Sequence, residues 1–177
     1  MKNDAVVFTQ QKPLINQYLK DTKAAWITDV AVVEGKNLED PFHTSVAINE
    51  ELNIPFPVGV HRALGGLHDA PNPGDILCAA LASCFESTLR MIANRLDIVL
   101  VKTKVVVKAE VDVRGSLMID REVPVGFQKM SVDVDLALDH LSHPSLGKKL
   151  IKATEHCCIV FQTLRRGTPI EVRVNLL

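Results

Sequence analysis

Four cysteines are the residues in this chain best suited to chemistry, and they form two pairs in the sequence. Cys78 and Cys84 lie six residues apart in an apolar segment, and Cys157 and Cys158 are adjacent near the C-terminus. On a helix, a spacing of six turns two side chains about 120° apart and separates them by about 9 Å along the axis, so the first pair cannot bond to each other. Adjacent helical residues diverge by about 100°, so at most one cysteine of the second pair faces a given site.

The histidine and cysteine spacings do not indicate a metal site. The sequence contains no Cys-x-x-Cys motif, and its six histidines are scattered. His61 and His68 flank the segment RALGGL, where they could line a site or polarise a substrate. The histidines nearer the C-terminus are His140, His143 and His156. We therefore expect neither a metal nor a cofactor.

Cys84 has two features that favour a functional role over a core position, where free cysteines are most often found. Ser87 and Thr88 share its helical face, so that face is not uniformly apolar. The second cysteine pair also lies in an expected helix. Packing two cysteine-bearing helices together would bring thiols into contact from distant sequence positions.

The segment around Cys84 predicts a helix over residues 73–95, about 34 Å long. Asn72 is a suitable N-cap, and Pro73 suits the first helical position. Asp75 lies in the first turn, where the positive end of the helix dipole favours an acid. Apolar residues follow on every face, which indicates a helix that is covered on all sides.

C-terminal to this helix, the pattern predicts two strands, a second helix and a final strand. The segments LVKTKVVVKAEVDVRG and MSVDVDLALD alternate apolar and polar residues, as strands with one buried face do. A second helix is expected over residues 145–166, ended by Gly167 and Pro169. The segment IEVRVNLL predicts the last strand.

From Met1 to about Ala70 the pattern of apolar residues predicts a less regular succession of helix and strands. The segment PLINQYLKDTKAA has helical spacing, whereas WITDVAVVEG and FHTSVAIN indicate short strands. The segment PFPVGVHRALGGLHDAPNPGD is rich in proline and glycine and predicts a loop, where functional sites are commonly built. Two strands, a helix, two strands, a helix and a strand together indicate the α+β class.

Composition argues against several classes of function. The chain has 177 residues, of which 47% are hydrophobic, so it can form a full core. Its net charge of −1 gives no electrostatic basis for binding nucleic acid or a membrane surface. No apolar run reaches about 18 residues, and the first residues lack a signal-peptide pattern. We therefore expect a cytoplasmic protein with reduced cysteines and no membrane span.

Three segments follow one another between about Val60 and the C-terminus: PNPGDILCAALASCF, then VDVRG, then HCCIVFQTL before a terminal strand. In these segments the sequence resembles the OsmC/Ohr family of peroxide-reducing thiol proteins. The resemblance implies one OsmC-like domain over residues 1–177, with residues 60–177 as the family core and residues 1–59 as an N-terminal helix and strands. It also implies an intertwined homodimer, in which central helices at about 73–95 and 145–166 are wrapped by antiparallel sheets.

The resemblance further implies a stress-defence enzyme, a thiol peroxidase that reduces organic hydroperoxides. Cys84 matches the cysteine that attacks the peroxide, and Cys158 matches the cysteine that resolves the resulting sulfenic acid to a disulfide. A dithiol or a lipoylated protein then reduces that disulfide. In the family an arginine from the preceding loop, held by a glutamate, lowers the pKa of the first cysteine. Arg62 is the arginine in that region, and it is either this cation or a solvated loop residue.

Two positions depart from the family pattern. The family's acidic residue directly after Asn-Pro is Gly74 here, with Asp75 one position later. Asp75 either holds Arg62 or serves only as a charge at the helix start. The usual proline after the second cysteine is Ile159, and the additional Cys157 leaves open which neighbour resolves.

Two other functions therefore stay open. The missing acid at position 74 favours a non-catalytic or ligand-binding protein of the same fold. A thiol-dependent hydrolase would use Cys84 as an acyl nucleophile and would need a nearby base, which only His61 or His68 could supply.

Overall fold

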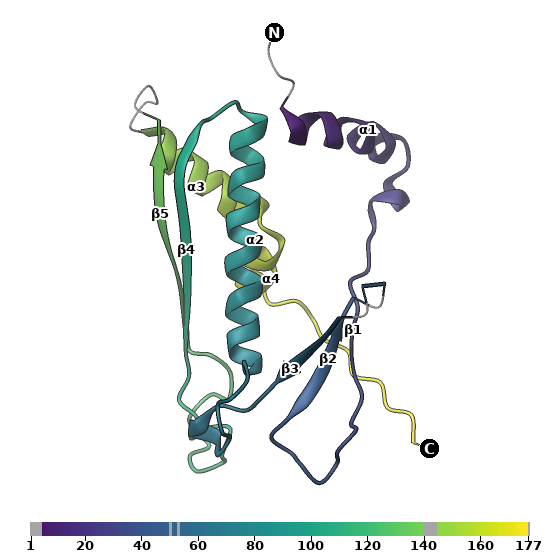
Figure 1. Cartoon of the computed structure of the whole chain (residues 1–177), viewed down its shortest axis with the longest axis vertical. Helices are drawn as coiled ribbons and strands as arrows, with labels where there is room; N and C mark the ends of the chain where they lie inside the picture. Colours follow the sequence, from purple (N-terminus) through teal and green to yellow (C-terminus); the bar gives the residue numbers. More distant parts are fainter. Residues whose placement is uncertain (1–4, 50, 53, 140–144, 177) are drawn as a thin grey trace.

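The computed structural model describes residues 5–49, 51–52, 54–139 and 145–176. Short 3-10 helices occur at η1 (Thr22–Ala25) and η2 (Arg62–Leu64). The main elements follow in the order α1 (Val6–Lys20), β1 (Ala31–Val33), β2 (Thr44–Ile48), β3 (Ile54–Val58), α2 (Pro73–Arg95), β4 (Leu100–Glu110), β5 (Lys129–Leu138), α3 (Ser145–Cys157) and α4 (Ile159–Arg166) (Figure 1). This is the α+β architecture that the sequence predicts.

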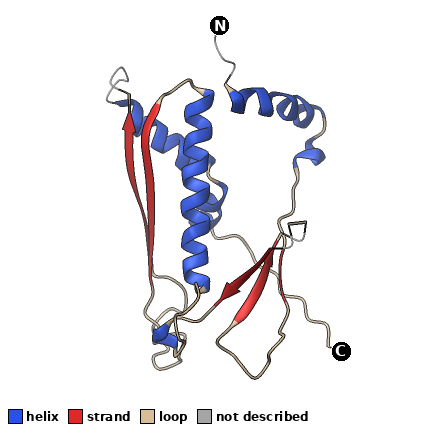
Figure 2. Cartoon of the chain, viewed as in Figure 1, coloured by secondary structure: helices blue, strands red, loops and turns tan. Residues whose placement is uncertain are grey.

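The core lies between α2, the β4–β5 hairpin and the two C-terminal helices (Figure 2). β4 and β5 pair antiparallel, with Val105 opposite Val134 and Val107 opposite Val132. These valines pack toward α2 because the alternation of apolar and polar residues turns them all to one face of the hairpin. Two buried clusters run along α2: Leu81 and Phe85 with Cys158, and Leu89 and Ala93 with Leu150.

A separate three-stranded sheet has the order β1-β2-β3, and the expectation that residues 55–75 form only a loop is wrong for its first part. β3 pairs antiparallel with β2 although it contains Pro55 and Pro57. A proline cannot donate a backbone hydrogen bond, but it is tolerated on an edge strand, and β3 lies at the edge of this sheet. The proline-rich composition therefore conceals a strand.

The predicted single helix over residues 145–166 is broken at Cys158. Its backbone is extended there, with ψ 114°, and α3 ends at Cys157 while α4 begins at Ile159. The Cys158 N–H still donates to the Thr154 carbonyl oxygen (2.9 Å), and the Cys158 Sγ accepts from the Phe161 N–H (3.5 Å). Cys158 is thus the N-cap of α4. Its sulfur accepts a hydrogen bond from the first turn of α4, in place of a backbone acceptor that is lost where the helix breaks.

The predicted last strand is not formed by residues 170–176. The apolar side chains of this segment point to solvent. Ile170 at its start is 89% exposed, and Leu176 at its end is 93% exposed. A strand needs a neighbouring strand to pair with, and the described part of this chain provides none here.

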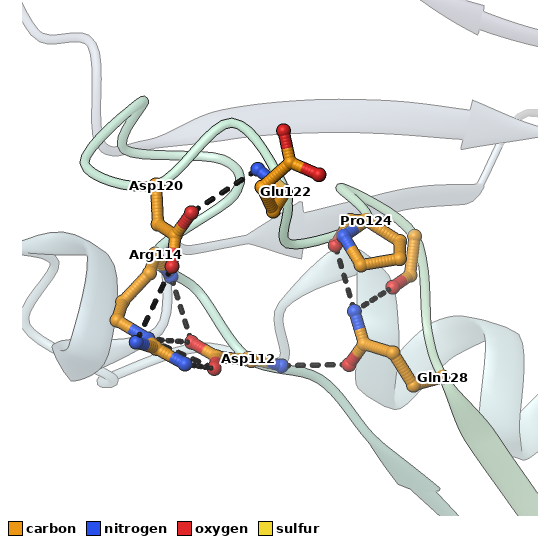
Figure 3. A network of polar contacts seen from close by, with 7 residues as sticks. Asp112, Arg114, Asp120, Glu122, Pro124 and Gln128 are labelled. Atoms are coloured by element: carbon orange, nitrogen blue, oxygen red, sulfur yellow. Dashed lines mark hydrogen bonds and ion pairs between the residues drawn. The ribbon is translucent and has the colours of Figure 1, made fainter.

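The predicted strand through residue 115 ends at Glu110, and a loop over residues 111–128 follows (Figure 3). Arg114 pairs with Asp112 and with Asp120, while Gln128 accepts from the Asp112 N–H (2.8 Å) and donates to the Pro124 carbonyl oxygen (2.7 Å). These bonds replace strand pairing, so the loop has a defined shape.

Helix α2 is much less covered than the sequence predicts. Its buried residues are Leu81, Phe85, Thr88, Leu89 and Ala93, all on one side. The chain exposes 14190 Å², whereas a compact monomer of this mass exposes roughly 8,500 Å². α2 is also the one helix among the described residues that is long and apolar enough to cross a membrane, a test that the core helix of a soluble protein passes too.

Candidate active site

Two thiols from distant parts of the sequence meet beside α2. Cys84 lies midway along α2, and Cys158 lies at the junction of α3 and α4. Their Sγ atoms are 3.3 Å apart. Leu81 and Phe85 surround the pair together with valines of the hairpin. The structure therefore brings together the two cysteines that the sequence analysis assigns to one site.

The two thiols differ in their surroundings. Cys158 is 0% exposed, whereas Cys84 is half-buried. Burial raises the pKa of Cys158 to about 11, the neighbouring Cys84 raises it too, and the Phe161 N–H offsets part of this effect. Cys158 thus keeps its proton at neutral pH and donates it toward the Cys84 Sγ.

A cavity of about 580 Å³ lies next to the thiol cluster. Its walls include Leu81, Phe85 and Phe161, which also pack around the cysteines, but neither sulfur lines it. The lining is mainly apolar, and its polar members are Gln128, Lys129, Glu155 and Arg165. The cavity can accommodate a small organic group beside the thiols.

Arg62 is exposed in η2, and its Nε donates to the Leu67 carbonyl oxygen at 3.4 Å. Among the described residues, no hydrogen bond or ion pair joins Arg62 to Cys84 or to a carboxylate. η2 precedes the first turn of α2, whereas Cys84 lies eleven residues beyond Pro73, about 16 Å along the helix (Figure 1). Within one chain, the thiols are therefore assembled without this cation.

Asp75 is engaged at the start of α2. Its Oδ2 accepts from the Asn72 N–H (3.0 Å) and Nδ2 (2.6 Å), while the Asn72 Oδ1 accepts from the N–H groups of Gly74 and Asp75. This is a reciprocal capping box. Of the two roles left open for Asp75, the structure supports the helix cap.

Gly74 lies against Phe127, a contact that explains the small residue at this position and that the sequence does not reveal. A Cβ placed on Gly74 would lie 3.0 Å from the Phe127 Cζ and 2.9 Å from the Asn72 Oδ1. Phe127 comes from the loop over residues 111–128, so only the fold reveals the contact. An acidic side chain at position 74 would require Phe127 to move.

Among the described residues, no contact joins His61 or His68 to either thiol of the pair. The His61 Nδ1 accepts from the Ala63 N–H (3.0 Å), and its ring packs edge-on against His68 at 4.8 Å. His140 and His143 lie outside the described residues, and His156 is exposed. The described residues contain no group of three or more metal-ligating side chains.

His43, which was not singled out from the sequence, bridges two loops. Its Nδ1 lies 2.8 Å from Asp40 Oδ2, and its Nε2 lies 3.0 Å from Asp69 Oδ1. Hydrogen bonds to Asp40 and then Asp69 raise the pKa of His43, and the same bonds lower the pKa of each carboxyl. We call these three residues the His43 clasp. It ties the β1–β2 loop to the segment that carries Arg62.

The remaining cysteines have separate environments. Cys78 is half-buried, and burial, followed by the charge of Asp75, raises the pKa of its thiol. Cys157 is exposed at the end of α3. The approach of Cys158 to Cys84 therefore leaves Cys157 on the solvent side.

Comparison with known proteins places this chain in a family. Residues 66–173, more than half of the chain, match the family described as OsmC-like protein. The chain belongs to the OsmC-like family. No curated protein matches the sequence.

Solved structures share the OsmC-like fold at low sequence identity. An OsmC-like protein of unknown function from Vibrio cholerae superposes with a TM-score of 0.63 and 11% identity, covering 78% of this chain and 94% of that one. An organic hydroperoxide resistance protein from Elizabethkingia anophelis gives 0.59 and 20%, covering 80% and 91%. One from Legionella pneumophila gives 0.57 and 22%, covering 78% and 90%.

Proposed function

We propose that this protein reduces organic hydroperoxides with the Cys84–Cys158 thiol pair, as part of peroxide and stress defence. The observation that carries the proposal is the 3.3 Å separation of two thiols with unlike environments. The half-buried Cys84 is accessible to a peroxide, and the fully buried Cys158 retains a proton. Membership of a family with hydroperoxide resistance proteins among its structural relatives supports the same chemistry.

In the first step, the Cys84 thiolate attacks the O–O bond. A sulfur–oxygen bond forms, the O–O bond breaks, and the alkoxide leaves and takes up a proton as an alcohol. Cys84 becomes a sulfenic acid. The cavity beside the cluster holds the organic group of the peroxide.

In the second step, the Cys158 sulfur attacks the Cys84 Sγ, and the two atoms close from 3.3 Å to about 2.05 Å. The sulfur–oxygen bond breaks, and hydroxide leaves with the Cys158 proton as water. Because the pKa of Cys158 is high, proton transfer to the departing oxygen accompanies the attack. A dithiol or a lipoylated protein then returns both cysteines to thiols.

We further propose that the active form is a cytoplasmic homodimer that supplies the missing cation. The exposed surface exceeds that of a compact monomer by more than one subunit usually buries in an obligate homodimer interface. The buried residues of α2 all lie on one side, and the extended segment 170–176 pairs with no described strand. In such a dimer, Arg62 of a second subunit can approach Cys84, with His61 and Cys157 as supporting candidates.

The test is one equivalent of cumene hydroperoxide added to the reduced protein, followed by alkylation and peptide mapping. We expect a Cys84–Cys158 disulfide, loss of peroxide consumption in C84S, and an unlinked, further oxidised Cys84 in C158S. The matched control C78S keeps full activity because Cys78 faces elsewhere. A main product linking Cys157 to Cys158, or Cys78 to Cys84, would contradict the proposal.

A second candidate is a non-catalytic, ligand-binding protein. It is favoured by Phe127, which fills the space of an acid at position 74, and by Arg62, which has no carboxylate partner among the described residues. Slow peroxide consumption by the wild type, together with binding of an apolar ligand in the cavity, would select this candidate. The hydrolase alternative loses support because His61 caps η2 rather than contacting Cys84.

A further inference from the structure

The cavity beside the thiols is bounded by two different parts of the structure. Leu81 and Phe85 line it and also pack against Cys158, so part of its wall surrounds the thiol pair. Phe127 lines it as well, but this residue belongs to neither buried cluster and comes from the loop over residues 111–128. The cavity therefore connects the surroundings of the thiols with this loop.

Phe127 lies far from the thiols along α2. The tip of its ring faces the first turn of this helix, because a Cβ placed on Gly74 would lie 3.0 Å from the Phe127 Cζ. Gly74 precedes Cys84 by ten residues, which is about 15 Å along the helix axis. The ring thus lies against both the cavity and the start of α2, about three helical turns from the level of Cys84.

Hydrogen bonds fix the backbone next to Phe127 (Figure 3). The Gln128 side chain accepts from the Asp112 N–H (2.8 Å) and donates to the carbonyl oxygens of Pro124 and Gly126 (both 2.7 Å). The Gln128 N–H also donates to the last carbonyl oxygen of β4 (3.0 Å). These four bonds make Phe127 part of a defined wall of the cavity.

We propose that Phe127 determines how long an organic group the cavity accepts, a role that rests on the proposed peroxide reaction. With the peroxide oxygens at Cys84, an unbranched chain extends along the apolar lining toward the start of α2 and meets the Phe127 ring. A group that ends before the ring gains apolar cover with each added methylene. A longer group leaves its end in water and gains no further cover. Phe127 is thus a specificity-determining residue.

The experiment measures the binding of primary alcohols of increasing chain length by calorimetry, because alcohols are the products of the proposed reaction. Wild type is compared with F127A, F127L and the control I119A, which changes a residue of the same loop that is 70% exposed and does not line the cavity. Wild-type affinity should rise by up to roughly fourfold per methylene and level off at a limiting length. F127A should bind the first alcohols beyond that limit at least about tenfold more tightly, and F127L should lie between F127A and wild type. I119A should match wild type.

The same limiting length in wild type, F127A and F127L, or no saturable binding to wild type, would overturn this role of Phe127. A second readout is the ratio of kcat/KM for a long-chain hydroperoxide to kcat/KM for tert-butyl hydroperoxide. This ratio should rise at least about tenfold in F127A and stay constant in I119A. If the alcohols give the expected shift but no variant or wild type consumes peroxide, the role of Phe127 stands and the proposed function fails. If peroxide is consumed but F127A leaves the ratio constant, the proposed function stands and the role of Phe127 fails.

Discussion

The thiol pair and the Arg62 segment are assembled to very different degrees. One chain brings Cys84 and Cys158 to 3.3 Å within a cluster of buried side chains. Arg62 lies in an exposed 3-10 turn, tied down by a backbone carbonyl and, through its segment, by the His43 clasp. Under the proposed function, one chain supplies the thiol pair, whereas the approach of a cation to Cys84 depends on the proposed dimer.

The largest expected effect concerns the assembly itself. We predict a dimer at micromolar concentration, because the open side of α2 and the extended apolar segment 170–176 need cover. Light scattering checks this directly. I170D/V172D should weaken the dimer, whereas E171K, at a polar position of the same segment, should leave it intact. A stable wild-type monomer would mean that one chain contains the complete site.

The next effect is the activation of Cys84. R62A should leave the protein folded but raise the pKa of Cys84, because a neighbouring cation shifts a pKa by about 1–3 units. Peroxide reduction near neutral pH should then fall by roughly one to two orders of magnitude and recover partly at higher pH. R62K should retain most of the activity. The measurement is the pH dependence of Cys84 alkylation and of hydroperoxide consumption.

Mixed dimers show which subunit supplies the cation. A dimer of one C84S subunit and one R62A subunit contains a complete site only if Arg62 acts across the interface. Recovery of about half the wild-type activity per dimer would establish action in trans. No recovery would mean that Arg62 acts on the Cys84 of its own chain. If the pH dependence of Cys84 alkylation is unchanged in R62A, a residue other than Arg62 supplies the cation.

The sequence predicts the helix and strands around Cys84 much better than it predicts the details that complete the site. Local rules identify α2 from the Asn72 cap and the β4–β5 hairpin from its alternation, and these elements hold Cys84 in place. The break at Cys158 depends on one backbone angle, which helical periodicity does not reveal. The contact of Phe127 with Gly74 joins two loops and has no local signal.

The last predicted strand, which the structure does not contain, was predicted wrongly for a different reason. Residues 170–176 alternate as a strand should, so the pattern is present, but no described strand of this chain lies where it could pair. Similarly, α2 is apolar on every face, yet one chain covers only one side. In both cases the sequence encodes surfaces that a single subunit does not bury.

A smaller effect concerns the His43 clasp and pH. The folded pKa of His43 is raised. Its contribution to the stability of the folded state is therefore complete below pH 6.5 and is lost as the pH rises through that folded pKa. The pKa values of Asp40 and Asp69 are lowered, so their contributions are present above pH 3.8 and are lost as the pH falls through the folded values. The clasp is therefore strongest between about pH 4 and 6.5.

Hydrogen exchange of residues 60–70, corrected for intrinsic rates, measures the clasp. Protection should fall from pH 6 to pH 9 in wild type, whereas H43Q should show low protection at both values. H156Q, at an exposed histidine on α3, should behave as wild type. A pH-independent wild-type profile would show that the segment is held without the clasp.

The smallest effect is expected at Asp75, and it separates stability from chemistry. D75N removes the charge of the capping box but keeps a side chain that can accept a hydrogen bond, so unfolding should become easier by about 0.5–1 kcal/mol. Because Asp75 bonds to Asn72 rather than to Arg62, the alkylation rate of Cys84 should not change. Denaturant unfolding and the Cys84 pH profile, measured on the same sample, test both statements. A slower Cys84 reaction at unchanged stability would instead mean that Asp75 orients Arg62 in the assembled protein, and that the capping box rearranges when the second subunit binds.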